Sequence, residues 1–305
     1  AQAAEQWPRL QSIADDYDLV LVSPGVNYAP GDVDIPGTEN DGSPLEYLRA
    51  FFKECNGCRV DHIAIHGYMR NASNFKEYVK KFEEFNKPIW VTEWASMGDW
   101  AVQSGRNHPG LEWQMDYLAE TTRWLEQTKS VHRYAWFVGR SRYGLNEPPY
   151  NSILAEDGVL SPLGGLYAAI PSTDYRYPIP TKIEAEGAHD LSGFSHQPTN
   201  DVDGLTNLVA TPGGEAMFKI SSEASVECVF DLRLASEKLG RALIQLDGEL
   251  AHHIPDVNTG SNDAWLTFRS DPVAISVGEH DLLIRSEGEF RFNWLRISEC
   301  LATEV

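Results

Sequence analysis

Side chains suited to sugar chemistry gather at the ends of three apolar segments. The first segment ends in His66 and Tyr68, the second in Glu93 and Trp94, and the third contains Trp136. Sugar hydrolysis uses a carboxylate at the anomeric carbon, and aromatic faces stack on pyranose rings. Glu93 is therefore the candidate catalytic residue. The alternative is that it is an ordinary charged residue at the end of a strand.

The elements that must position these residues form βα units in the first part of the chain. Alternating strand-like and amphipathic helical segments are typical of a parallel sheet, whose active sites lie at the carboxyl ends of the strands. Ser43 followed by Pro44 predicts the start of the first of these helices. Helical spacing of apolar residues predicts a second helix over 75–85, a third over 113–125 and a last short one near Pro162. The strands are expected at 17–22, 60–66, 89–93 and 134–138.

A change of composition predicts a second domain. Residues 171–180 read PSTDYRYPIP, and three prolines in ten residues favour an extended linker. After it come short segments of alternating polarity with turn signals such as Asp247-Gly248, which indicate a β-sandwich. We therefore expect a catalytic α/β domain at 1–170, a linker at 171–181 and an all-β domain at 182–305.

Composition and charge exclude several classes of protein. Of 305 residues, 42% are apolar and 11% aromatic, which excludes a disordered chain. The net charge of −20 disfavours nucleic acid and anionic membranes as partners, and no apolar run reaches the ~20 residues of a membrane span. The chain begins AQAAEQWPRL without a Met, so we expect a processed or trimmed product. Four cysteines allow two disulfides and favour an oxidising compartment.

Three motifs in order resemble one glycosidase family. CNGCRVDHIAIHGY at 55–68, PIWVTEWA at 88–95 and YAWF at 134–137 closely resemble glycoside hydrolase family 128, the endo-β-1,3-glucanases. The resemblance implies a (β/α)8 TIM-type barrel, a secreted enzyme acting on β-1,3-glucan, and no catalytic cofactor. It assigns the nucleophile of a retaining mechanism to Glu93. It places His66, Tyr68, Trp94 and Trp136 in the glucan cleft, with barrel-closing core residues as the alternative for each.

The resemblance also exposes a gap in the barrel. The four βα units of this chain match the last four of the family, whose acid/base Glu lies in an Asn-Glu-Pro segment on the fourth strand. The Asn-Glu-Pro at 146–148 follows the last barrel strand, so we reject Glu147 as the acid. We expect the N-terminal half-barrel to exist as a further segment or a separate chain. The alternatives are a non-catalytic β-glucan-binding or cell-wall protein, or a glycosidase that acts on another β-glycan.

The Cys55-x-x-Cys58 motif leaves a choice of chemistry. With His62 and His66 it could form a four-ligand zinc site, since thiolates and imidazoles at short spacing suit zinc. A local disulfide or two free thiols are the alternatives. Both histidines would have to leave the strand face to reach the cysteines, which disfavours zinc.

The second domain resembles a carbohydrate-binding module of family 6, a jelly-roll β-sandwich. The IEAE segment at 183–186 and the FRFNWLRI segment at 290–297 carry the resemblance. It implies a structural calcium on Glu184, Glu186 and Asn293, and oxygen ligands are what calcium requires.

Two sugar-binding positions depart from this second family. Asn262 stands where the family usually has an aromatic platform, Arg291 stands where it has an Asn, and Trp265 matches the core Trp. A sandwich that binds no sugar is therefore the alternative. Cys228 and Cys300 lie on predicted strands of this domain and could pair.

Overall fold

The chain folds into two compact units. The computed structural model describes residues 2–27, 43–96, 110–142 and 144–303. One unit comprises Ala1–His108 with Trp124–Asn151, and the other comprises Pro109–Arg123 with Ser152–Val305. This division differs from the predicted boundary at 171–181. The second unit includes the start of helix α5 because the side chain of Arg123 is buried there against backbone carbonyls of residues 186 and 188.

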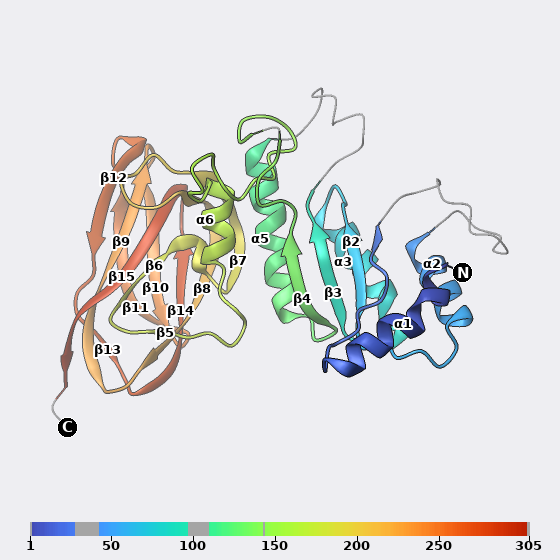
Figure 1. The fold of residues 1–305 in the computed structure, drawn as a ribbon. Coiled ribbons are helices and arrows are strands. Elements are labelled where there is room, and N and C mark those ends of the chain that lie inside the picture. Colours follow the sequence, from blue (N-terminus) through green and yellow to red (C-terminus); the bar gives the residue numbers. More distant parts are fainter. Residues whose placement is uncertain (1, 28–42, 97–109, 143, 304–305) are drawn as a thin grey trace. The chain divides into compact units, whose positions relative to one another are not determined.

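The first unit is built on a four-stranded parallel sheet (Figure 1). The strands follow one another across the sheet in chain order, as successive βα units do, and each adjacent pair is parallel. This confirms the predicted α/β character of the first part of the chain. The strands are β1 (Val26–Asn27), β2 (Ile63–Gly67), β3 (Ile89–Trp94) and β4 (Val131–Trp136).

Helices accompany these strands, and α2 begins at the residue that the sequence indicates. The Ser43 hydroxyl accepts a hydrogen bond from the Glu46 amide at 3.2 Å, which caps α2 as predicted. Asn71 caps α3 in the same way through the Asn74 amide at 3.0 Å. The helices are α1 (Gln2–Asp16), α2 (Pro44–Glu54), α3 (Ala72–Lys81), the 3₁₀ turn η1 (Phe82–Phe85) and α5 (Leu111–Gln127). In the described residues, no helix combines the length and apolar character needed to cross a bilayer.

The predicted first strand at 17–22 is wrong. Helix α1 runs to Asp16, and parallel pairing begins only at Leu21 and Val22, which hydrogen-bond or bridge to Asp61 and His62 before β1. Leu19 and Val20 remain 52% and 55% exposed. The segment lies beside the edge of the described sheet, so its apolar residues are not enclosed by neighbours on both sides as in a central parallel strand.

The second unit is a β-sandwich of mostly antiparallel strands. Across the sheet the order is β11-β10-β14-β8-β15-β9-β12, so β15 lies between β8 and β9. Helix α6 (Pro162–Ala169) and the 3₁₀ turn η2 (Ala185–Gly187) belong to the same unit. The strands are β5 (Tyr177–Pro178), β6 (Thr181–Glu184), β7 (Asp190–Pro198), β8 (Thr206–Ser222), β9 (Val226–Ser236), β10 (Gly240–Leu246), β11 (Glu249–Val257), β12 (Ser261–Arg269), β13 (Val273–Ile275), β14 (Gly278–Ser286) and β15 (Phe290–Ala302).

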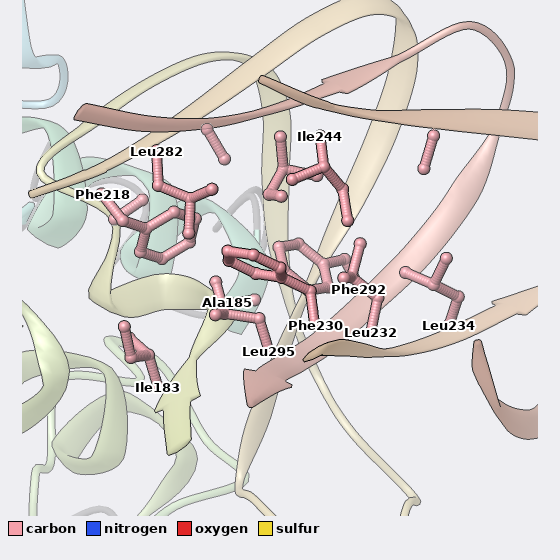
Figure 2. Packing of buried hydrophobic residues seen from close by; sticks show 14 of the residues in the cluster. Ile183, Ala185, Phe218, Phe230, Leu232, Leu234, Ile244, Leu282, Phe292 and Leu295 are labelled. Carbon is pink, nitrogen blue, oxygen red and sulfur yellow. The ribbon is translucent and has the colours of Figure 1, made fainter. Parts of the chain in front are cut away.

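One apolar core fills the sandwich. Phe218, Phe230 and Phe292 come from three different strands and are fully buried in it, with Ile244 and Leu282 from two more (Figure 2). Strands β8, β10 and β14 show the period-two alternation that the sequence indicates, with every second side chain turned inward. In β9 and β15, where alternation was also expected, runs of consecutive residues are buried instead. The predicted β-sandwich is therefore confirmed.

All four cysteines form disulfides. Cys55 pairs with Cys58, three residues away, and Cys228 pairs with Cys300, 72 residues away. The zinc alternative for the first pair is therefore wrong, because both sulfurs are bonded to each other and neither is left as a thiolate ligand.

The two disulfides are expected to differ in their contribution to stability. Loop-closure entropy predicts that replacing Cys228 and Cys300 by Ser lowers the free energy of unfolding by about 4 kcal/mol. The Cys55–Cys58 disulfide closes a much shorter loop, so replacing both of its cysteines by Ser is expected to lower the free energy of unfolding by only about 1–2 kcal/mol. Denaturant unfolding of the two double variants measures both values. Equal losses would contradict the loop-length account.

Candidate active site and cation-binding site

Glu93 lies at the carboxyl end of β3, where the strand departs from regular alternation. Val91 and Trp94 are buried, whereas Thr92 and Glu93 between them are both half-buried. The register against β4 shifts between Val91 and Trp94. A bulge of this kind turns the residues after it to the opposite face. It therefore leaves the Glu93 side chain 34% exposed.

Two side chains from the end of β2 hold one oxygen of the Glu93 carboxylate. The Tyr68 hydroxyl donates a hydrogen bond to Glu93 Oε2. His66 Nδ1 lies 3.2 Å from the same oxygen. Among the described residues no hydrogen bond or ion pair reaches the other oxygen, Oε1. Three predicted site residues therefore converge, because the ends of adjacent parallel strands meet at one edge of the sheet.

The Tyr68 phenol remains a donor over the whole working range of a glycosidase. Burial, the hydrogen bond to Glu93 and the charge of Glu93 together raise the pKa of Tyr68 well above its usual value. A hydrogen bond from a neutral phenol to a carboxylate is charge-assisted and therefore strong. The arrangement is suited to holding the Glu93 carboxylate in one orientation.

Removing this hydroxyl is expected to weaken catalysis without unfolding the sheet. A hydrogen bond to a charged group contributes about 1.5–3 kcal/mol, so Tyr68→Phe is expected to lower kcat/KM roughly 10- to 100-fold. The measurement is steady-state hydrolysis of a β-1,3-glucan by the full-length protein, with the melting temperature recorded alongside. Unchanged kcat/KM in a folded variant would show that the contact has no catalytic role.

The two tryptophans lie elsewhere than expected. Trp94 is 0% exposed and packs edge-on against Tyr134 and Trp136, with ring centroids 5.4 and 5.2 Å apart. Trp136 is 7% exposed, and its indole N–H donates to the Asn151 carbonyl at 2.8 Å. The expectation that Trp94 stacks on glucan is corrected, since its ring has no free face. Trp136 also packs in the interior, as expected for the alternative in which it is a core residue.

Asn151 is a residue of this region that the sequence did not indicate. Its side-chain amide donates to the Phe137 carbonyl at 3.0 Å, while its own carbonyl accepts from Trp136. The ring of Phe137 in turn meets Tyr68 edge-on, with centroids 5.7 Å apart. Asn151 thus fixes the end of β4 beside the residues that hold Glu93. No sequence motif includes it, so only the fold reveals it.

A second cluster of oxygen atoms lies in the sandwich, at the three predicted calcium ligands. Glu184 Oε2, Glu186 Oε2 and Asn293 Oδ1 are buried and have no hydrogen-bond donor in the described part of the chain. Strand pairing brings them together, because β6 lies antiparallel to β15 with Glu184 opposite Trp294. Buried acceptors without a partner are rare in folded proteins.

The remaining polar atoms of these three residues are satisfied. Glu184 Oε1 pairs with Lys182 Nζ at 2.9 Å, and Glu186 Oε1 accepts from the Thr206 hydroxyl. Asn293 Nδ2 donates to Asp201 Oδ2 at 2.8 Å, which turns its Oδ1 toward the cluster. One oxygen of each residue is therefore left for another ligand.

Space and charge at the cluster also suit a small cation. A methyl group at Gly204 would lie 2.7 Å from Asn293 Oδ1 and 3.4 Å from Glu184 Oε2, so both oxygens face this glycine. Burial raises the pKa of Glu186 to about 7, and the nearby Glu184 charge acts in the same direction. A hard cation bound by these oxygens would offset both the burial of the Glu186 charge and its repulsion by Glu184. The residues fit the calcium that the resemblance implies.

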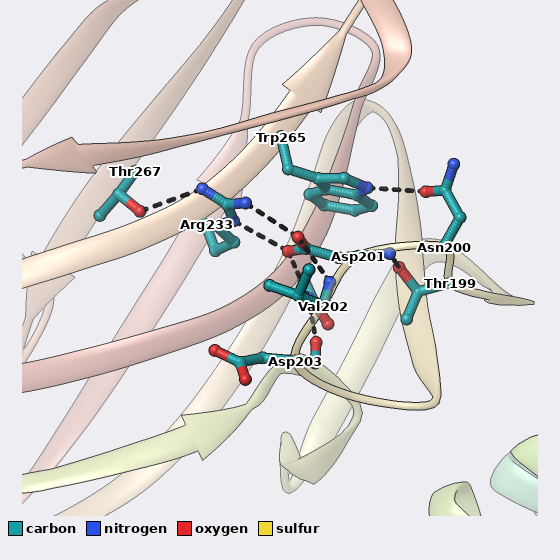
Figure 3. A network of polar contacts seen from close by, with 9 residues as sticks. Thr199, Asn200, Asp201, Val202, Asp203, Arg233, Trp265 and Thr267 are labelled. Carbon is teal, nitrogen blue, oxygen red and sulfur yellow. Dashed lines mark hydrogen bonds and ion pairs between the residues drawn. The ribbon is translucent and has the colours of Figure 1, made fainter.

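An ion pair fixes the loop that carries Gly204 (Figure 3). Arg233 binds both carboxylate oxygens of Asp201 at 2.8 Å. Burial opposes the charge of Asp201, but the bonds from Arg233 and Asn293 outweigh it and lower the pKa of Asp201. The Trp265 indole donates to Asn200 at 2.9 Å in the same loop. Trp265 is a core residue, as predicted.

The two positions that depart from the module family are engaged with neighbouring residues. Asn262 Oδ1 accepts from the Glu237 amide at 3.1 Å. Arg291 Nη1 pairs with Asp263 Oδ1 at 2.9 Å. Neither position presents an aromatic platform to a sugar.

The first part of the chain matches a known family. The model described as "Glycosyl hydrolase catalytic core" matches residues 1–167, which is more than half of the chain. The chain belongs to this family, and the predicted glycoside hydrolase class is confirmed.

One curated relative matches part of the chain. Alkali-sensitive linkage protein 1 of Schizosaccharomyces pombe is 30% identical over 132 residues, which are 43% of this chain and 24% of that protein. The chain thus spans about a quarter of the length of this relative.

Solved structures of two kinds match parts of the chain. An endo-β-1,3-glucanase of family GH128, subgroup II, from Sorangium cellulosum is 33% identical, with a TM-score of 0.46, and covers 55% of this chain and 62% of its own. A β-1,3-glucan-binding CBM6 from Bacillus halodurans is 23% identical, with a TM-score of 0.37, and covers 40% of this chain and 98% of its own. The CBM6 of lichenase 5A from Cellvibrio mixtus is 24% identical, with a TM-score of 0.37, and covers 39% of this chain and 97% of its own.

Proposed function

We propose that this chain carries the nucleophile of a retaining endo-β-1,3-glucanase, and that the nucleophile is Glu93. The observation that supports this is the asymmetric contact of its carboxylate. Oε2 is held by Tyr68 and His66, whereas Oε1 forms no hydrogen bond or ion pair with the described residues. A carboxylate anchored through one oxygen can direct the other at an anomeric carbon.

The reaction proceeds in two steps that share one acid/base residue. Glu93 Oε1 forms a bond to C1 of a glucosyl unit while the C1–O bond to the next unit breaks, and a carboxylic acid gives its proton to the departing oxygen. The same group, now a carboxylate, takes a proton from water, which attacks C1 and releases Glu93. Tyr68 and His66 keep the carboxylate oriented through both steps. The chemistry needs two carboxyl groups ~5–5.5 Å apart and no cofactor.

The acid/base residue is assigned to a part of the barrel outside this chain. The proposed whole is a (β/α)8 barrel, of which the first unit supplies the last four βα units. The four parallel strands in chain order and the match to a catalytic core family support this arrangement. The N-terminal half-barrel would be either a further segment of the polypeptide or a separate chain.

The sandwich is proposed to hold a structural calcium through Glu184, Glu186 and Asn293. Calcium bound there would supply a hard positive charge for their three unpartnered oxygens. We further propose that the protein acts outside the cell on β-glucan. Both disulfides support this location, because such bonds persist in oxidising compartments.

A covalent trap tests the nucleophile independently of the acid. The full-length protein is incubated with the 2,4-dinitrophenyl glycoside of a 2-deoxy-2-fluoro-β-1,3-linked glucose disaccharide. Dinitrophenolate leaves without being protonated, so the glycosyl group should accumulate on the nucleophile even if protonation is impaired. Peptide mass spectrometry is expected to find the added glycosyl mass on the peptide that carries Glu93.

The outcomes separate the proposal from its rivals. A label on another residue would overturn the assignment to Glu93. Binding of a β-1,3-glucan without any label would favour a non-catalytic cell-wall protein. Labelling by a differently linked fluoro-glycoside alone would favour a glycosidase of another β-glycan.

A further inference from the structure

A buried arginine reaches the cation-site loop from helix α5. Arg123 is 9% exposed and lies within the second unit. Its Nε donates to the Ala188 carbonyl at 3.0 Å, and its Nη2 donates to the Glu186 carbonyl at 2.8 Å. Burial of a guanidinium is costly unless its donors are satisfied. These two hydrogen bonds therefore offset part of the cost of burying Arg123.

The loop that Arg123 contacts has few backbone partners of its own. β6 ends at Glu184 and β7 begins at Asp190, so the segment between them lies outside the strand ladders. Its middle carbonyl, that of Gly187, accepts from the Tyr177 hydroxyl at 3.0 Å. Side chains therefore hold three successive carbonyls, and Arg123 holds two of them.

Helix α5 has a second anchor in the same unit. Asp116 Oδ1 accepts from both the backbone amide and the Nδ1 of His196 in β7, each at 2.8 Å. Asp116 and Arg123 thus tie the same stretch of helix to the sandwich at two points. Only the Arg123 anchor ends on the segment that carries a proposed calcium ligand.

We infer that Arg123 is a positioning residue for the cation site and that it couples occupation of this site to the packing of α5 residues 111–123. This inference rests on the proposed calcium site. Calcium on Glu186 would fix the loop whose carbonyls accept hydrogen bonds from the Arg123 guanidinium. Conversely, packing of helix α5 would hold that loop in the geometry that binds calcium. Such coupling is reciprocal, so each event strengthens the other by the same factor.

The test measures calcium affinity and helix protection in the full-length protein. Titration calorimetry gives the calcium Kd, and hydrogen exchange with and without calcium follows peptides from 111–123. In the wild type, calcium is expected to slow exchange in 111–123 as well as in 182–188. Arg123→Gln is expected to raise the Kd about tenfold and to abolish the response in 111–123.

Two further variants keep the test decisive. Arg241→Gln removes an exposed arginine on β10 and should leave both readouts unchanged. Arg123→Lys keeps the charge but not the two-point contact, and should give intermediate values if Arg123→Gln does not fold.

The possible failures can be told apart. No calcium binding by the wild type would overturn the calcium site itself. Calcium binding with unchanged exchange in 111–123 would overturn the coupling and leave the site standing. An unchanged Kd in folded Arg123→Gln would overturn the positioning role.

Discussion

Replacing Glu93 by glutamine is expected to lower kcat on a soluble β-1,3-glucan by on the order of 10⁴-fold or more, the scale on which loss of a covalent nucleophile acts. Glutamine keeps the shape of the side chain and can still accept the Tyr68 hydrogen bond, but its amide does not attack the anomeric carbon. Glucan binding should survive, because the substitution changes no residue other than Glu93 that could contact the polymer. Reducing-sugar release and affinity electrophoresis of the full-length protein measure the two properties.

The matched control for this variant is Glu147→Gln. Glu147 lies in the loop after β4, in an Asn-Glu-Pro segment that follows the last barrel strand and does not match the place of the family's acid. Its replacement should leave kcat within about twofold of the wild type. Retained turnover in Glu93→Gln, or a large loss in Glu147→Gln, would contradict the assignment of the nucleophile.

Removing the cation from the sandwich is expected to lower the stability of the folded protein. A ligand present at 100 times its Kd stabilises the folded state by about 2.7 kcal/mol, and about 4 kcal/mol at 1,000 times. For a unit of this size, chelation with EDTA should lower the melting temperature by about 6–12 °C. Differential scanning calorimetry with excess calcium and with EDTA measures the shift.

Two variants show whether the shift comes from the proposed ligands. Glu184→Gln with Glu186→Gln should eliminate the calcium-dependent difference, because the amide pair carries no charge. Glu249→Gln, at an exposed position of β11, should retain it in full. A calcium shift that persists in the double variant would place the cation elsewhere.

The sequence predicted those features of the fold that depend on local chemistry. Ser43 and Pro44 begin α2 because a capping hydroxyl and a preset backbone angle act within one turn. Phe75, Tyr78 and Val79 are buried along α3 because their spacing places them on one helix face. The meeting of His66 and Glu93 could be predicted because both lie at the ends of segments whose pattern indicates parallel strands.

Features that depend on register or on distant contacts could not be predicted. Trp94 faces the core because of the register shift between Val91 and Trp94, and no residue type there signals a bulge. The Arg233–Asp201 pair joins positions 32 residues apart. Arg123 is one cation among several on a predicted helix, so its burial against two carbonyls emerges only from the packing.

The place of β15 determines when the sandwich can be completed during synthesis. Strands β8 and β9 lie on either side of β15 and come off the ribosome first, whereas β15 begins at Phe290. At 5–20 residues per second, β8 and β9 wait on the order of ten seconds for the strand that joins them. Their edges are unpaired during this interval and open to association with other nascent chains. Strand β15 therefore closes the sandwich after β8 and β9 have been made, and a chaperone that shields β8 and β9 would act before it appears.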